Sequence, residues 1–151
     1  MVSLKKGEEI SSWVEGLIYP PKQVREYSID FTVSSIYVPE KRGELDFGGG
    51  EYSESGFKEL MPRKNSKDDR YGWWELEPEI YLISFNETWR RSSEDEVGLL
   101  SPHPRLFRTF AFHPTLIVME WKKEFKLPLF VGKKGLRIKQ NARVSKLLIM
   151  R

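Results

Sequence analysis

Glu120 is the residue whose surroundings most favour proton-transfer chemistry. It follows the apolar run Leu116-Ile-Val-Met119 and precedes Trp121, so its carboxyl group stands alone on an otherwise apolar expected strand. Partial burial there would favour the protonated carboxyl group, which suits a general acid or base. The alternative is that Glu120 lies on the polar side of an edge strand and pairs with Lys122 or Arg108. Taken without other information, these residues favour the second interpretation.

The two histidines do not form a pattern that predicts metal binding. His103 and His113 each precede a proline and are ten residues apart, unlike paired histidines on adjacent turns of a helix. We therefore interpret both as structural. The chain has no cysteine, which excludes thiolate zinc sites, iron–sulfur clusters and a cysteine nucleophile. It also lacks the Gly-x-Ser-x-Gly elbow of serine hydrolases. The sequence thus predicts no zinc and no other protein-bound metal.

Charge is unevenly distributed along the chain. Residues 105–151 contain 12 basic and 2 acidic residues, whereas residues 1–104 contain 13 basic and 20 acidic residues. The basic third is suited to a phosphate-bearing ligand, a nucleic acid or an acidic patch on a second copy, and the alternative is a solvated surface. If the ligand is a nucleic acid, Trp121, Phe125 and Phe130 are the expected stacking surfaces.

Apolar spacing predicts one short helix followed by many strands. The helical stripe consists of Ile10, Trp13, Val14, Leu17 and Ile18. Pro20 and Pro21 are expected to end this helix. From Tyr27 to Val33 apolar and polar residues alternate, as in a half-buried strand. Further strands are expected at 36–38, 79–86, 97–100, 106–112, 115–121, 127–131, 136–139 and 144–150. This pattern predicts an all-β sandwich, jelly roll or barrel.

A chain of 151 residues is expected to form a single domain over its whole length. Residues 51–71 are polar and predict a surface loop, and Gly48-Gly-Gly50 predicts a turn. The opening residues are charged and no apolar run approaches about 18 residues, so we expect no signal peptide, no membrane span and a cytoplasmic protein. Few Asn and Gln residues beside many Lys and Glu residues suit a thermophile.

Several segments resemble, in order, the dCTP deaminase branch of the dUTPase superfamily. Residues 4–10, Gly16-Leu-Ile18 and Ser28-Ile-Asp30 resemble its opening helix, Gly-x-Ile turn and Ser-Val-Asp-Leu strand. Residues 74–78, 81–87 and 94–99 resemble the strands that precede its catalytic loop. Gly135-Leu-Arg-Ile and Asn141-Ala-Arg-Val resemble its closing strand. The chain therefore looks like a divergent, archaeal-type member of this superfamily.

The resemblance implies a distorted jelly roll, or dUTPase-like β-barrel, that assembles as a homotrimer with active sites between subunits. It implies a deoxynucleoside triphosphate as the ligand, with Mg²⁺ bound alongside. The implied activity is conversion of dCTP to dUTP or of dUTP to dUMP. Two alternatives remain open: a catalytically inactive nucleotide-binding or structural homologue, and a nucleic-acid-binding β domain.

The resemblance also implies site residues, in either of two alignments of the family's Arg-Ser-Ser-x-x-Arg loop. One places it at Arg91-Ser92-Ser93. The other, which we prefer, places it at residues 102–108, with His103 and Arg105 contacting substrate and Arg108 stabilising the transition state. Asp30 would support the site. His113 falls where dUTPases have their water-activating aspartate, and Glu120 matches the deaminase glutamate.

Overall fold

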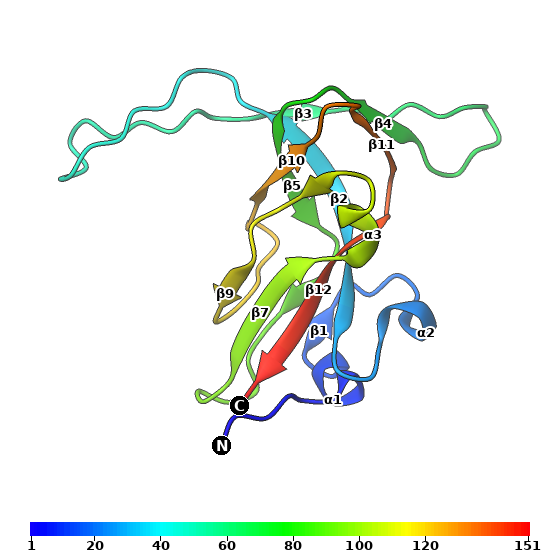
Figure 1. Cartoon of the computed structure of the whole chain (residues 1–151), viewed down its shortest axis with the longest axis vertical. Coiled ribbons are helices and arrows are strands. Elements are labelled where there is room, and N and C mark those ends of the chain that lie inside the picture. The colour runs from blue at the N-terminus through cyan, green and yellow to red at the C-terminus, as the bar shows by residue number, and fades with distance from the viewer.

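The computed structural model describes residues 1–151 and contains three short helices and twelve strands (Figure 1). The helices are α1 (Gly7–Ser11), α2 (Pro20–Gln23) and α3 (Pro104–Phe107). The strands are β1 (Val14–Glu15), β2 (Ile29–Val38), β3 (Lys58–Leu60), β4 (Trp73–Leu76), β5 (Ile80–Phe85), β6 (Thr88–Trp89), β7 (Val97–Pro102), β8 (Ala111–Phe112), β9 (Leu116–Val118), β10 (Leu127–Val131), β11 (Leu136–Lys139) and β12 (Arg143–Met150). The predicted all-β class is confirmed, although the structure has three short helices where one was expected.

Eight strands form the largest sheet, which curls into half a barrel (Figure 1). Its order is β8-β10-β5-β2-β12-β7-β9, with β3 added beside β2, and the neighbouring strands are antiparallel. The ten-residue strand β2 lies in the middle of this order. It pairs with β12 along its first half and with β5 and β3 along its second half. Two small ribbons, β1–β6 and β4–β11, complete the structure.

Strand β2 is buried on both faces along its first five residues. Ile29, Phe31 and Val33 pack into the apolar core, and each is fully buried. Because successive side chains of a strand point to opposite faces, Asp30 and Thr32 face the other way. They too are buried, at 0% and 2% exposure. Two polar side chains on the central strand must therefore find their partners inside the protein.

The predicted helix near the N-terminus is wrong in its extent. Helix α1 ends at Ser11, the chain then forms β1, and α2 begins at Pro20. Gly16 turns the chain with a φ of 89°, and a Cβ there would lie 2.3 Å from the Asn86 carbonyl oxygen. Pro20 and Pro21 thus begin helix α2 instead of ending the predicted helix. Proline is suited to the first turn, where its missing N–H would lack a partner in any case.

The predicted strand at 106–112 is also wrong. His103 caps a helical turn that opens with Pro104, and the buried Leu106 anchors that turn in the core. Phe110 then adopts a positive φ of 58°, and only Ala111–Phe112 is extended. A single turn of helix and a short strand can have the same spacing of apolar residues, so the spacing over 106–112 does not distinguish the two structures.

The polar segment at 51–71 contains a strand that its composition did not indicate. Lys58–Leu60 pairs with Ile36–Val38 of β2. This pairing separates two projecting segments, residues 39–57 and 61–72 (Figure 1). At the tip of the first, Gly48–Gly50 forms the expected turn, in which the Asp46 carboxylate accepts backbone N–H bonds from Gly49 and Glu51.

No helix of the structure has the length and apolar character needed to cross a membrane.

Limited trypsin digestion should distinguish these projecting segments from the strand between them. Lys41 and Arg42 in the first segment, and Lys67 and Arg70 in the second, should be cut before Lys58, because Lys58 belongs to a hydrogen-bonded strand. Mass spectrometry of the early fragments gives the order of cleavage. Early cleavage after Lys58 would contradict the pairing of β3 with β2.

Candidate anion-binding site

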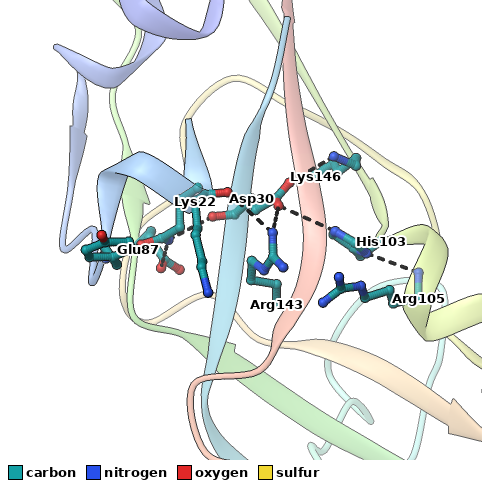
Figure 2. A network of polar contacts seen from close by, with 9 residues as sticks. Lys22, Asp30, Glu87, His103, Arg105, Arg143 and Lys146 are labelled. Atoms are coloured by element: carbon teal, nitrogen blue, oxygen red, sulfur yellow. Dashed lines mark hydrogen bonds and ion pairs between the residues drawn. The ribbon is translucent and has the colours of Figure 1, made fainter. Parts of the chain in front are cut away.

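A buried carboxylate organises the candidate site. Asp30 Oδ1 accepts a bond of 2.9 Å from Lys146 Nζ, and Oδ2 accepts one of 3.1 Å from Arg143 Nη1 (Figure 2). His103 Nε2 lies 3.4 Å from the same Oδ2. The carboxylate side chain is 1% exposed, so these contacts replace its water.

A register shift in β12 brings both cations to Asp30. In a regular strand Arg143 and Lys146 would point to opposite faces, because their positions differ by an odd number. The ladder with β2 is irregular between Arg143 and Ser145. An irregularity of this kind re-aims side chains. It allows one carboxylate to bind two cations from the same strand.

His103 connects this cluster to helix α3. Its Nδ1 accepts the backbone N–H of Arg105 at 3.1 Å, which leaves the Nε2 proton directed towards Asp30. Burial lowers the pKa of His103, the nearby Asp30 charge opposes this effect, and Lys146 and Arg143 lower the pKa further. His103 is therefore neutral at physiological pH and holds the start of α3 in place.

The cluster forms one wall of a cavity of about 260 Å³ with no apolar side chain lining it except that of a proline. The lining residues are Arg25, Asp30, His103, Pro104, Arg105, Arg108, Arg143 and Lys146. Five cations thus surround one carboxylate. Arg143 and Lys146 are paired with it, whereas Arg25, Arg105 and Arg108 are exposed and make no ion pair. Unpaired guanidinium groups around a small polar cavity favour an anion with several oxygen atoms, such as a phosphate chain.

His113 lies outside this cavity, inside the protein. Its Nε2 is 2.6 Å from Ser145 Oγ and its Nδ1 is 2.8 Å from the Pro114 carbonyl oxygen. Burial lowers the pKa of His113, so the neutral ring donates from Nδ1 and accepts from Ser145. A serine, a base and an orienting acceptor have the geometry of a nucleophilic pair. His113 is however 1% exposed and Ser145 is 0% exposed, so substrate has no access to them and the contact ties β12 to the loop between β8 and β9.

Glu120 lies just after β9 and is partly buried. It lines a separate cavity of about 410 Å³ that Trp13 and Trp89 also border. Neither Lys122 nor Arg108 pairs with it. Within one chain, the structure therefore does not bring Glu120 together with Asp30 and Arg108.

Arg91, Ser92 and Ser93 lie in the loop between β6 and β7, apart from the Asp30 cavity. Ser92 binds the Glu96 carboxylate: the Ser92 N–H donates to Oε2 at 3.0 Å, and the Ser92 hydroxyl donates to Oε1 at 2.6 Å. Lys5 Nζ is 2.5 Å from the same Oε1. Burial alone would raise the pKa of Glu96, but hydrogen bonds from Lys5 and Ser92 outweigh it and lower the pKa to about 2.

A second buried carboxylate, Glu87, was not anticipated from the sequence. It accepts bonds from the Thr32 N–H at 2.7 Å, the Thr32 hydroxyl at 2.6 Å and Gln23 Nε2 at 2.8 Å. Burial raises its pKa, and these hydrogen bonds oppose the shift. Gln23 also donates to the Asp30 carbonyl oxygen at 2.9 Å. The network joins α2 and the start of β6 to β2 beside Asp30 (Figure 2). Polar residues in loops carry no periodic signal that could have identified it.

Comparisons with known proteins give a result at the level of the fold. No family model and no curated protein matches the sequence. Among the solved structures that match is the 2′-deoxycytidine 5′-triphosphate deaminase from Agrobacterium tumefaciens, with a TM-score of 0.65 and 12% sequence identity. The match covers 99% of this chain and 48% of that protein, so the chain spans about half its length.

The chain therefore has a dUTPase-like fold, as the sequence resemblance predicted. The shared fold does not support the narrower interpretation of a divergent archaeal-type member, because the identity is low.

The Glu96 contacts predict a pH-dependent contribution to stability. A folded-state pKa of about 2, against an ordinary value of 4.5, means that the contribution is complete above pH 4.5 and is lost as the pH falls towards 2. Glu96→Gln should lower the free energy of unfolding at pH 7 by roughly 1–3 kcal/mol, since Lys5 loses its buried partner. Urea denaturation at several pH values measures this. The loss should shrink below pH 4.5, and the exposed Glu94→Gln serves as control. Equal losses at pH 7 and pH 2.5 would contradict the assignment.

Proposed function

We propose that this chain binds a deoxynucleoside triphosphate in the Asp30 cavity and acts on it as a dCTP deaminase or a dUTP diphosphatase. The observation that carries the proposal is the set of five cations around one polar cavity. The chain has the fold of a deaminase acting on such a nucleotide, and this likeness supports the same class of ligand. A triphosphate carries several negative charges and many acceptor oxygens, which suits clustered guanidinium groups.

The cavity residues have two different roles in this proposal. Arg105 and Arg108 of the α3 region, with Arg25, contact the phosphate oxygens, because their guanidinium groups have no other ion partner. Arg143 and Lys146 stay fixed on Asp30 and add positive charge at the wall. His103 is neutral and positions the backbone N–H of Arg105.

In this proposal Mg²⁺ is bound by the triphosphate of the substrate and not by the protein alone. No group of three or more His, Asp or Glu side chains is arranged to hold a metal ion. Asp30, the only carboxylate of the cavity, already has both oxygens engaged. The protein's residues therefore do not fit a resident Mg²⁺ site, and the triphosphate itself would carry the ion.

Glu120 is the proposed proton shuttle, and it requires a second subunit. It lines a cavity different from the one around Asp30. A homotrimer would allow Glu120 of one subunit to complete the Asp30 cavity of the next. Large apolar side chains are exposed in the single chain, Phe110 at 84% and Ile117 at 72% among them, and contacts between subunits would bury side chains of this kind.

His113 favours a second candidate function, nucleotide binding without catalysis. By the sequence resemblance it replaces the aspartate that activates water in dUTPases. It is buried and bonded to Ser145, so it offers no base to a substrate. This observation counts against the diphosphatase reaction, so deamination is the better supported of the two proposed activities and binding alone is the second candidate function.

Arginine substitutions test the binding proposal and the two alignments. Arg105→Ala and Arg108→Ala should each weaken dCTP or dUTP binding about 10- to 100-fold, since a hydrogen bond to a charged group contributes roughly 1.5–3 kcal/mol. Arg91→Ala is the matched control and should leave binding unchanged. Isothermal titration calorimetry with each nucleotide measures the affinities. A large effect of Arg91→Ala without an effect of Arg108→Ala would overturn the proposed site.

Replacing Glu120 separates catalysis from binding. Glu120→Gln should keep nucleotide affinity and the trimer mass while lowering turnover of dCTP with Mg²⁺ by at least ~10²-fold, the scale of losing a general acid or base. Glu124→Gln, in the same cavity lining, is the control. Sedimentation confirms the assembly state of each variant. Nucleotide binding by the wild type without turnover would select the non-catalytic function.

A further inference from the structure

Three cavities of the protein adjoin one another through shared lining residues. A cavity of about 610 Å³ at the β4–β11 ribbon shares Trp73 and Arg137 with a cavity of about 380 Å³ beside α3. The second cavity shares Arg105 and Arg143 with the Asp30 cavity. The labels β4, β11 and α3 lie on the same side of the molecule in Figure 1. We call the three adjoining cavities together the Trp73 groove.

The Trp73 groove is basic overall, and its positive charge is concentrated beside α3 and around Asp30. Nine cationic side chains and three carboxylates line it, a net charge of six. One of the three carboxylates, Asp30, is buried against its own partners. Another, Glu75, is 81% exposed and lies 3.4 Å from Arg137. A path of this size and sign exceeds what a single triphosphate can neutralise, and it suits an extended polyanion.

An aromatic ring lies midway along the groove. Strand β4 alternates, so Trp74 and Leu76 are buried whereas Trp73 is only half-buried and borders two of the cavities. Trp74 Nε1 donates to the Leu60 carbonyl oxygen at 2.9 Å, which marks Trp74 as structural. The Arg137 guanidinium lies 4.1 Å from the centre of the Trp73 ring. Tryptophan and arginine planes are the surfaces on which proteins stack unpaired bases.

We propose that the Trp73 groove binds a single strand of nucleic acid. Phosphates lie against the cations from Lys139 to the Asp30 cavity, and a base stacks on the Trp73–Arg137 pair. The three aromatic residues that the sequence suggested as stacking surfaces do not line the Trp73 groove and pack against other side chains. Trp121 is 2% exposed, Phe125 packs on its ring, and Phe130 stacks on Phe112 at 4.8 Å.

The cavity around Trp13 provides a matched comparison within the same protein. Its volume is about 410 Å³, and Arg90 lies 5.5 Å above the Trp13 ring, as Arg137 lies above Trp73. Three cations and three carboxylates line it, so it has no net charge. Tryptophan beside arginine occurs in both places, and only the Trp73 groove adds the charge that a nucleic acid requires.

Fluorescence anisotropy with 5′-labelled (dT)₁₂ tests the proposal, using the full-length wild type without added nucleotide. Trp73→Ala should weaken binding roughly 5- to 100-fold, the range expected from base–aromatic stacking. Trp13→Ala should leave it unchanged. Arg137→Ala and Lys139→Ala change exposed residues of β11, so they test the groove even if Trp73→Ala fails to fold. Each should weaken binding and reduce the slope of log K against log salt by about 0.7.

A second set of probes separates stacking from charge alone. An abasic 12-mer has the same phosphates without bases and should bind more weakly than (dT)₁₂. Polyglutamate of equal charge should bind more weakly still. Equal affinities for (dT)₁₂, the abasic strand and polyglutamate, or equal effects of Trp13→Ala and Trp73→Ala, would overturn the proposal. Trp73→Ala should keep the wild-type affinity for dCTP, because Trp73 lies outside the Asp30 cavity, so failure of this proposal is distinguishable from failure of the proposed function.

Discussion

The buried carboxylate of Asp30 is the constraint on which the arrangement of the site depends. An ionised carboxylate with no exposed surface costs several kcal/mol in desolvation unless charged partners replace its water. The partners come from two further elements: Arg143 and Lys146 from β12, and His103 from the start of α3. Neutralising one side chain of β2 thus determines where β12 and α3 must lie. The irregular register of β12 is the backbone distortion that allows it.

The same constraint leaves positive charge in excess. Once Lys146 and Arg143 have engaged the two oxygens of Asp30, no other carboxylate lines the cavity for the remaining guanidinium groups. Arg105 and Arg108 follow His103 within a few residues, so capping α3 on Asp30 carries them to the cavity rim. A structural ion cluster and an open anion site are therefore two parts of one arrangement. The buried contacts of Asp30 fix the positions of β12 and α3, and the exposed guanidinium groups of Arg105 and Arg108 keep hydrogen-bond donors for an anion.

The sequence predicted the class of fold and part of the site, for identifiable reasons. The apolar runs near the C-terminus placed β10, β11 and β12 well, and alternation over Tyr27–Val33 located the first half of β2 because a two-residue period is a strong signal. The strand expected separately at 36–38 is the continuation of β2. The Ser-Ile-Asp30 and Ala-Arg143 segments resembled known strands, and the structure brings Asp30, His103, Arg105 and Arg108 to one cavity. Helices of four or five residues gave no such period, and Pro20 was interpreted as an end although it is a beginning. Lys146 and Glu87 were missed because their partners are distant in sequence.

The two proposed ligands meet at the same cations, and this overlap separates their requirements. Arg105 and Arg143 border both the Asp30 cavity and the cavity beside α3, so a bound triphosphate and a bound strand would compete for them. Trp73 and Arg137 lie outside the Asp30 cavity and can serve only the longer ligand. Affinity for a single nucleotide therefore depends on the residues around Asp30. Affinity for a strand depends on those residues together with a ring on the β4–β11 ribbon, whose outward orientation follows from the alternation of β4.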